Sequence, residues 1–179
     1  MPLRRVIIVT SLLLTICTVT AQEGLNPFSA YPAGTNFIHK NLVALNGDTI
    51  VSATLDSSIV WYNFWHTRCK PCVMEMEELN RIALEYKDSP NVMFIAIACD
   101  DSSTVVEFMK LHRFEFQIVA FQKTAFLSYF SVSRFPTNIL VDSNQQVVLE
   151  IIGGTIKPEQ VQEHIQPLTK RLEQLITNQ

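Results

Sequence analysis

Two hydrophobic patterns alternate along this chain and predict a strand–helix–strand core. Residues 59–65 and 92–99 are β-branched and aromatic runs that are apolar on both faces, as central buried strands are. Between them, apolar residues recur at spacings of three and four from Pro71 to about Lys87, which predicts an amphipathic helix. The same criteria predict strands at 116–119, 137–141 and 146–152 and helices at 102–113, 124–130 and 158–176.

Two local signals complete this α/β outline. Asn46-Gly47 lies between the apolar runs 41–45 and 49–51, which predicts an N-terminal β-hairpin. Pro167 falls inside the last predicted helix, where we expect a kink or a break. Strands that alternate with helices, followed by a strand pair and a last helix, predict one sheet with helices on both faces.

Composition and charge restrict the class of protein. The chain has 179 residues, 47% of them hydrophobic and 17% charged, which is enough to bury the core of one domain. The formal net charge is -3 and the chain has no long basic run, so it lacks the electrostatic footprint of a nucleic-acid-binding protein. We therefore expect a single globular domain and no nucleic-acid partner.

Residues 1–21 have the pattern of a secretory signal peptide. Arg4 and Arg5 precede an apolar run from Val6 to Cys17, and the small residues at 19–21 suit cleavage by a signal peptidase. We therefore expect an exported protein of the periplasm or cell envelope. Its mature chain would have an extended lead-in at 22–36 and one domain at 37–179.

Two alternatives to a cleaved signal stay open. The apolar run could remain as a short membrane anchor, although it falls short of the ~20 residues that a spanning helix needs. Cys17 could instead be lipidated, although the bulky Ile16 stands where lipoprotein signals carry a small residue. Either alternative would keep the protein associated with a membrane.

The remaining cysteines indicate chemistry rather than a disulfide scaffold. Outside the predicted signal the chain has only Cys69, Cys72 and Cys99. Cys69 and Cys72 come directly after a predicted buried strand, at the first turn of a predicted helix. The helix dipole and free N–H groups there lower a thiol pKa, which makes Cys69 the nucleophile. Cys72 would then attack the mixed disulfide and release the reduced substrate.

A Cys-x-x-Cys pair has two other interpretations, a zinc site and an inert disulfide. Zinc needs further ligands at close spacing, and only His66 lies near the pair, whereas His39, His112 and His164 are scattered. A disulfide across so short a loop contributes little to stability through loop entropy. We therefore expect a redox pair with no metal and no cofactor.

The segment from Trp65 to Cys72, WHTRCKPC, resembles the active-site segment of the thioredoxin superfamily. The Asn-Phe-Trp sequence at 63–65 and the Cys-x-Pro-Cys form are most similar to the TlpA-like and ResA-like proteins of the bacterial envelope, over roughly residues 37–176. This resemblance implies a thioredoxin-like fold, with a central mixed β-sheet, helices on both faces and an N-terminal β-hairpin. It also implies a protein-disulfide oxidoreductase with protein disulfide or dithiol substrates and a membrane electron donor. It suggests a reductant, with an apo-cytochrome awaiting haem attachment as a substrate class.

A second motif, RFPTNIL at 134–140, resembles the family's cis-proline segment. The resemblance implies that Pro136 is cis, lies beside the cysteines and keeps metals off the thiolates. It also implies that the Phe135 backbone pairs with substrate, and that Trp65 and Phe135 contribute to substrate binding. The alternative is an ordinary proline that begins a strand.

Three positions near the cysteines bear on this resemblance. Arg68 stands where many members have an aromatic residue, which makes the surface offered to partners more cationic. Asn63 replaces the buried acid of thioredoxins, as it does in ResA-like proteins, which place a Glu three residues after the second cysteine. Glu75 occupies that place and is therefore a candidate proton acceptor for Cys72. The alternative is a solvated first-turn Glu that the helix dipole stabilises.

The direction of electron flow and some competing functions stay open. Lys70 would stabilise a Cys69 thiolate and favour an oxidant, whereas the resemblance favours a reductant. Thiol peroxidases share the fold but use Thr-x-x-Cys, and here His66 stands three residues before Cys69. A redox-inactive binding module would not need the intact pair. Cys99 is either a third redox thiol or a small buried hydrophobe.

Overall fold

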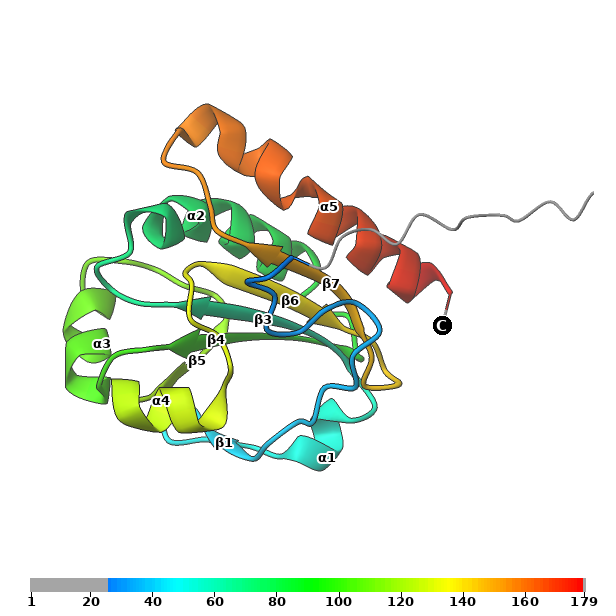
Figure 1. Ribbon diagram of the computed structural model, residues 1–179, viewed down its shortest axis with the longest axis horizontal. Helices are drawn as coiled ribbons and strands as arrows, with labels where there is room; N and C mark the ends of the chain where they lie inside the picture. The colour runs from blue at the N-terminus through cyan, green and yellow to red at the C-terminus, as the bar shows by residue number, and fades with distance from the viewer. Residues whose placement is uncertain (1–25, 179) are drawn as a thin grey trace, which may run out of the picture.

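The structure is a computed structural model that describes residues 26–178, so the predicted signal at 1–21 lies outside the described residues. Its centre is a five-stranded mixed sheet in the order β5-β4-β3-β6-β7, in which β3, β4 and β5 are parallel and β6 and β7 are antiparallel to their neighbours (Figure 1). The strands are β3 (Ile59–Trp65), β4 (Val92–Ala98), β5 (Gln117–Ala120), β6 (Thr137–Val141) and β7 (Val147–Ile152).

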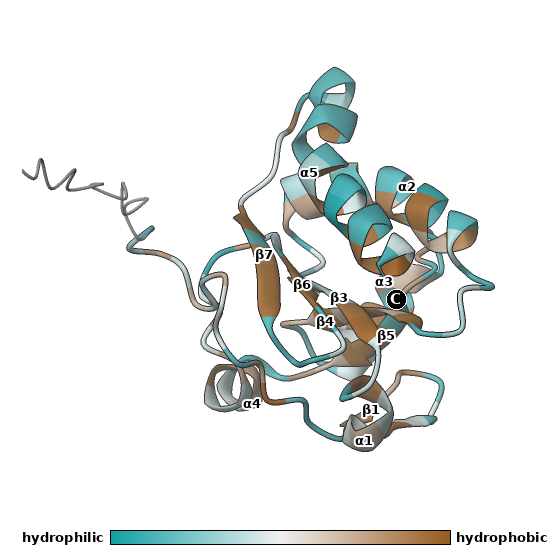
Figure 2. Ribbon diagram, turned by 90° about the vertical axis from the view of Figure 1, so that its right-hand side faces the viewer, coloured by the Kyte–Doolittle hydropathy of each residue, from teal (hydrophilic) through white to brown (hydrophobic). Residues whose placement is uncertain are grey.

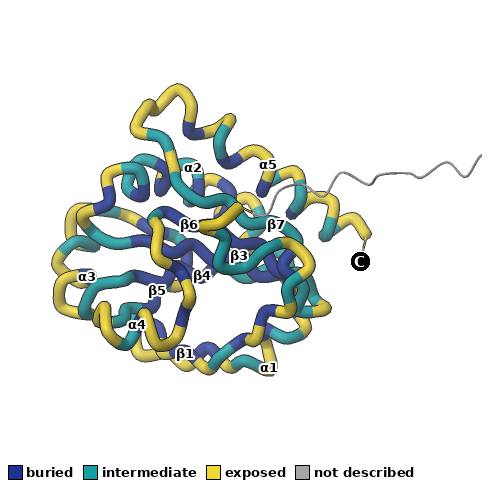
Figure 3. The backbone as a smooth tube through the Cα atoms, in the orientation of Figure 1, coloured by how far each residue is buried: buried dark blue, intermediate teal, exposed yellow. Residues whose placement is uncertain are grey.

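Strand β3 is the core of the sheet because both of its faces are covered. All seven of its residues are buried, as the continuous apolar run predicted. Successive side chains alternate between the faces. Trp61, Asn63 and Trp65 therefore point to one side of the sheet, and Tyr62 and Phe64 to the other. Figure 3 shows the buried strands surrounded by exposed outer turns.

Helices cover both faces of the sheet, as predicted. One face carries α2 (Lys70–Glu85), α3 (Ser102–Met109) and α5 (Pro158–Thr177), and its core contains Trp61, Leu79 and Leu168. The opposite face carries α4 (Lys123–Tyr129) and the short helix α1 (Ser52–Leu55). Figure 2 shows apolar strands between helices whose outer surfaces are hydrophilic. The two long helices, α2 and α5, each bury an apolar stripe, whereas α1, α3 and α4 each bury a single residue.

The predicted hairpin is present, with strands β1 (Leu42–Val43) and β2 (Thr49–Ile50) paired antiparallel. Gly47 in its turn has a φ of 92°, a left-handed conformation that favours glycine. The hairpin reaches the edge of the main sheet, where the Leu45 N–H donates to the Ile118 carbonyl at 2.7 Å. It therefore covers part of an otherwise open edge strand.

Two predicted helix features differ in the structure. Helix α3 ends at Met109 rather than near Arg113. The Asn80 side chain on α2 donates to the Arg113 carbonyl and accepts from the Glu115 N–H, which holds this segment in a non-helical path that leads the buried Phe114 into the core.

Helix α5 runs without a break through Pro167. Pro167 is exposed, whereas Ile165 and Leu168 are fully buried on the sheet side. Water can therefore satisfy the carbonyl that the proline leaves unpaired, and packing keeps the helix continuous.

The described part of the lead-in, residues 26–36, contains no helix and only one isolated bridge, from Asn36 to Gln146. It is attached to β7 because the Glu150 carboxylate accepts from the Ser29 hydroxyl and from the N–H groups of Ala30 and Tyr31. No helix within residues 26–178 has the length and hydrophobicity to cross a membrane.

Candidate active site

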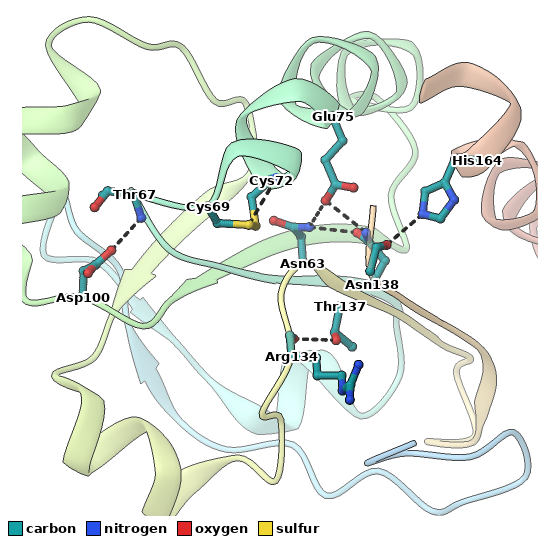
Figure 4. The surroundings of a disulfide bond; sticks show 11 residues. Asn63, Thr67, Cys69, Cys72, Glu75, Asp100, Arg134, Thr137, Asn138 and His164 are labelled. Atoms are coloured by element: carbon teal, nitrogen blue, oxygen red, sulfur yellow. Dashed lines mark hydrogen bonds between the residues drawn. A yellow bond between two sulfur atoms is a disulfide. The ribbon is translucent and has the colours of Figure 1, made fainter. Parts of the chain in front are cut away.

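Cys69 and Cys72 lie where β3 ends and α2 begins, joined in a disulfide (Figure 4). Cys69 is the N-cap of α2, and its Sγ accepts a hydrogen bond from the Cys72 N–H at 3.3 Å. Cys69 is 6% exposed and Cys72 is 1% exposed, so a partner can reach Cys69 more easily. After reduction, the Cys72 N–H and the helix dipole would face a Cys69 thiolate and would favour Cys69 over Cys72 as the attacking sulfur.

The Phe135–Pro136 peptide bond is cis, as the resemblance implied. The Gly153–Gly154 turn after β7 packs between this bond and α2. A Cβ on Gly154 would lie 2.9 Å from Pro136 Cγ and 3.2 Å from Pro71 Cβ, so only glycine fits without a shift. The Gly153 N–H donates to the Pro136 carbonyl at 2.7 Å, and the Gly153 carbonyl lies 2.8 Å from His164 Nε2. Pro136 and the start of α2 are therefore neighbours, although 65 positions separate Pro71 from Pro136 in the sequence.

The two predicted substrate contacts differ in accessibility. Phe135 is partly exposed, with ring centroids 5.2 Å from His66 and 5.6 Å from Phe126, so it can contact a partner beside the disulfide. Trp65 is 0% exposed and packs among Phe108 and Phe114, so its indole offers no surface to a docking partner. The predicted substrate role of Trp65 is therefore wrong for its side chain, because strand alternation places the indole in the core.

Glu75 is buried, 2% exposed, one helical turn after Cys72. Its Oε1 accepts hydrogen bonds from Asn63 Nδ2 at 2.7 Å and Asn138 Nδ2 at 3.1 Å (Figure 4). Its Oε2 is buried and has no hydrogen-bond partner within residues 26–178. A solvated first-turn Glu therefore does not describe this residue.

Burial dominates the titration of Glu75. Removal of the carboxylate from water raises the pKa of Glu75 to about 8, while the hydrogen bonds from Asn138 and Asn63 act in the opposite direction. The group is therefore mainly protonated at neutral pH. Because its pKa lies close to that of an ordinary thiol, it can exchange a proton with a cysteine at little cost in free energy.

Sequence reasoning missed Asn138, which completes this network. Asn138 is 0% exposed, and its Oδ1 accepts from Asn63 Nδ2 and from Trp61 Nε1, both at 3.0 Å. A signal was present, because Asn138 is a polar residue inside an apolar strand and follows Pro136 by two positions. The network joins α2, β3 and the strand that begins beside the cis-proline.

Cys99 lies at the end of β4, where its N–H donates to the Trp65 carbonyl at 2.8 Å. It is partly buried with Phe121 and Phe135 on the α4 face of the sheet. Burial raises the pKa of the Cys99 thiol, which disfavours a reactive thiolate. Among the described residues, no three His, Cys, Asp or Glu side chains gather into a group that could hold a metal ion.

Comparisons with known proteins agree with this geometry. Residues 33–150 match the AhpC/TSA family. The chain is 34% identical over 126 residues to a thiol-disulfide oxidoreductase ResA of Bacillus cereus, covering 70% of this chain and 72% of that one. It is 28% identical over 138 residues to ResA of Halalkalibacterium halodurans, covering 77% of both chains.

Solved structures share the fold at lower identity. The crystal structure of a candidate thiol:disulfide interchange protein DsbE from Chlorobium tepidum has a TM-score of 0.68 and 21% identity, covering 82% of this chain and 99% of that chain. The thioredoxin domain of a thiol-disulfide oxidoreductase from Bacteroides vulgatus has a TM-score of 0.59 and 20% identity, covering 74% and 96%. The sequence match, the fold and the disulfide at the start of α2 together show that this chain belongs to the AhpC/TSA family and is a ResA-like thiol–disulfide oxidoreductase of thioredoxin-like fold.

Proposed function

We propose that this protein is a reductant of disulfides in exported proteins. In this proposal it acts in the periplasm or cell envelope, after export by the segment at 1–21, and a membrane electron donor returns it to the dithiol form. Apo-cytochromes awaiting haem attachment are the proposed substrate class. The ResA relatives support the proposal through sequence similarity, and the burial of the disulfide supports it through physical chemistry.

The observation that carries the reductant direction is the burial of the cysteine pair. Reduction would create a thiolate on Cys69 or Cys72, which are only 6% and 1% exposed. Glu75 on the same helix is also buried. Burial disfavours a thiolate, whereas the disulfide is neutral. The free energy therefore favours the disulfide, and the dithiol gives up its electrons readily.

Positive charge at the surface stabilises the thiolate and so raises the reduction potential, but its effect is weaker than that of burial. Arg68 and Lys70 flank Cys69 and would stabilise its thiolate. Both side chains are exposed, so water and ions screen their charge. Burial of the two sulfurs acts in the low dielectric of the interior, where electrostatic effects are larger. We therefore expect a reduction potential nearer to about -270 mV than to about -120 mV, the range covered by thioredoxin-fold enzymes.

The reaction proceeds through two exchange steps. The Cys69 thiolate attacks one sulfur of a substrate disulfide, forms a mixed disulfide and releases the other substrate sulfur, which takes up a proton. Cys72 then loses its proton to the Glu75 carboxylate and attacks Cys69 Sγ. This closes the Cys69–Cys72 disulfide and releases the second substrate sulfur, which takes up the proton that Glu75 received and leaves as a thiol. The substrate gains two electrons and two protons, and the enzyme dithiol loses them.

The cis-proline segment would hold the substrate during these steps. Pro136 lies beside the start of α2, and the partly exposed Phe135 precedes it. In the proposal the Phe135 backbone pairs with an extended substrate segment, and Pro136 keeps metal ions from the thiolates.

Equilibration with glutathione buffers and trapping of the mixed disulfide test this function together. A Cys72→Ser variant should hold exported substrates through Cys69, and the wild-type pair should stay oxidised in buffers that reduce an oxidant of the same fold. A potential near -120 mV would overturn the reductant direction. No exchange with any dithiol would overturn the function itself.

Thiol peroxidase is the second candidate, because residues 33–150 match the AhpC/TSA family. Cys69 is paired with Cys72 one turn away, and His66 stands three residues before it. A Cys72→Ser variant that turned over peroxide would favour this candidate, whereas we expect no turnover.

A further inference from the structure

The two residues beside Cys69 form a positive rim on the solvent side of the disulfide. Arg68 and Lys70, which we call the cationic rim, immediately flank Cys69 in sequence, and both are exposed. The chain as a whole is acidic, with a formal net charge of -3. Positive charge is therefore concentrated where a partner must approach, against the overall charge of the protein.

Neither rim residue is neutralised within the described part of the chain. The ion pairs there join Arg81 with Glu78 and Glu85, Lys110 with Glu107, and Arg113 with Glu115.

The acidic residues of the neighbouring β4–α3 loop are engaged with backbone groups. Asp100 Oδ2 accepts from the Thr67 N–H at 2.7 Å (Figure 4). Asp101 Oδ1 accepts from the Thr104 N–H at 2.9 Å, as the N-cap of α3. Among the described residues neither carboxylate forms an ion pair with Arg68 or Lys70, so both cations are free to contact a partner.

The rim also opposes the stability of the helix that carries it. Lys70 is the first residue of α2, and the first turn of this helix contains no acidic residue. A cation at a helix N-terminus is disfavoured by the helix dipole, and acidic residues are usual there. Apart from the Cys69 thiolate of the reduced form, the two cations have no charged partner among the described residues, so they remain free to interact with another molecule.

We propose that the cationic rim selects partners that carry acidic residues next to their reactive cysteine. This inference rests on the proposed reductant function and names its substrate class. In the mixed disulfide the partner sulfur is bonded to Cys69, so residues adjacent to the partner cysteine lie within about 10 Å of both rim side chains. Opposite charges at this separation speed the encounter and orient the partner disulfide toward Cys69.

Two peptides that differ only in charge test the proposal. Each carries the same disulfide, flanked by glutamates in one and by lysines in the other. The reduced protein is mixed with each peptide, and every rate is divided by the rate with dithiothreitol, which removes the intrinsic reactivity of the peptide. We expect the acidic peptide to react about tenfold faster at low salt. The preference should fall toward one at 1 M salt, where the Debye length is about 3 Å.

Charge reversal provides the matched variants. The double variant Arg68→Glu, Lys70→Glu should prefer the basic peptide, and it should fold, because acids suit a helix N-terminus. The control Lys87→Glu reverses an exposed lysine beyond the far end of α2 and should keep the wild-type preference. Because each preference compares two peptides with one enzyme, a change in enzyme potential cancels.

The outcomes separate this inference from the function on which it rests. Equal normalised rates for the two peptides, or an unchanged preference in the double variant, would overturn the inference and leave the reductant standing. Reduction of neither peptide would overturn the proposed function and the inference together.

Discussion

Two buried titratable side chains lie on opposite faces of β3, and their comparison shows that burial alone does not identify a catalytic group. Glu75 lies on the α2 face, where it contacts Asn63, and His39 lies on the other face, 2.7 Å from the Tyr62 hydroxyl. Each has one buried polar atom without a hydrogen-bond partner in the described chain, Glu75 Oε2 and His39 Nε2. Burial favours the neutral form of both, since it raises the pKa of Glu75 and lowers the pKa of His39.

The difference between them is placement. Glu75 follows Cys72 by one helical turn, and its proposed role is to exchange a proton with the reacting thiols. His39 is enclosed by Phe37 and Tyr62, on the opposite face of the sheet from the start of α2. A perturbed pKa therefore marks a candidate catalytic group only where geometry brings it to the reacting atoms. We expect Glu75 to affect rate and stability, and His39 to affect stability alone.

The largest expected effect is on the pair itself. Cys69→Ser should abolish reduction of a peptide disulfide, because it removes the attacking sulfur. Cys99→Ser, the control, should keep the wild-type rate, since Cys99 lies on the α4 face with Phe121. If Cys99→Ser lost activity although Cys69 and Cys72 were intact, a third thiol would take part in the exchange reaction.

Glu75→Gln should lower the exchange rate by about 100-fold at neutral pH, the usual contribution of general acid–base catalysis. Glutamine can keep the hydrogen bonds from Asn63 and Asn138 but cannot take a proton. The wild-type pH–rate profile should show an inflection near pH 8 that the variant lacks. His39→Gln is the control and should keep both the rate and the inflection. An inflection that persists in Glu75→Gln would assign it to another group.

The pH dependence of stability should have opposite signs for the two groups. Because the folded-state pKa of Glu75 is raised to about 8, its contribution is fully present below the unfolded value of 4.5 and is lost as pH rises through 8. The folded-state pKa of His39 is lowered, so its contribution is present above the unfolded value of 6.5 and is lost as pH falls. In urea unfolding measured across pH, the wild-type free energy of unfolding should fall between pH 4.5 and about 8. Glu75→Gln should remove this part of the fall, which is on the order of a few kcal/mol. His39→Gln should reduce only the loss of stability that occurs as pH falls below 6.5. If both variants changed stability in the same pH range, the opposite pKa shifts of Glu75 and His39 would be contradicted.

The smallest effect is expected from the His39 hydrogen bond. Tyr62→Phe removes the hydroxyl that lies 2.7 Å from His39 Nδ1 and should lower the free energy of unfolding by about 1 kcal/mol. The exchange rate should not change, because Tyr62 points away from α2. A slower rate in a fully folded variant would show that the two faces are coupled.

Much of the fold could be predicted because strong local patterns agree with tertiary packing. The apolar run at 59–65 became β3 with the predicted bounds, and the first turn of α2 carries the cysteines as expected. The C-terminal end of α3 and the continuity through Pro167 could not be predicted, because Asn80 and the packing of α5 decide them. The short helix α1 carries too few residues for a periodic pattern.

The candidate site also contains some features that the sequence alone could predict and others that it could not. The reactive pair was evident from Cys69 and Cys72, since their spacing and position after a strand are local features. The cis bond at Pro136 and the role of Glu75 came only as implications of the resemblance. Trp65 was assigned wrongly because the substrate role came from the resemblance, whereas the apolar run at 59–65 already predicted a strand that is buried on both faces.

By itself the sequence determined the succession of apolar runs, the cysteine pair at a helix start and the two cations beside it, because each depends on neighbours within a few residues. Only the tertiary structure decided that Glu75, Asn63 and Asn138 meet, and that Glu75 and His39 lie on opposite faces of one strand. These facts depend on contacts of α2 and β3 with β6, whose Asn138 is 63 positions from Glu75 and 75 from Asn63 in the chain. The pKa of Glu75 follows from the water that those contacts exclude.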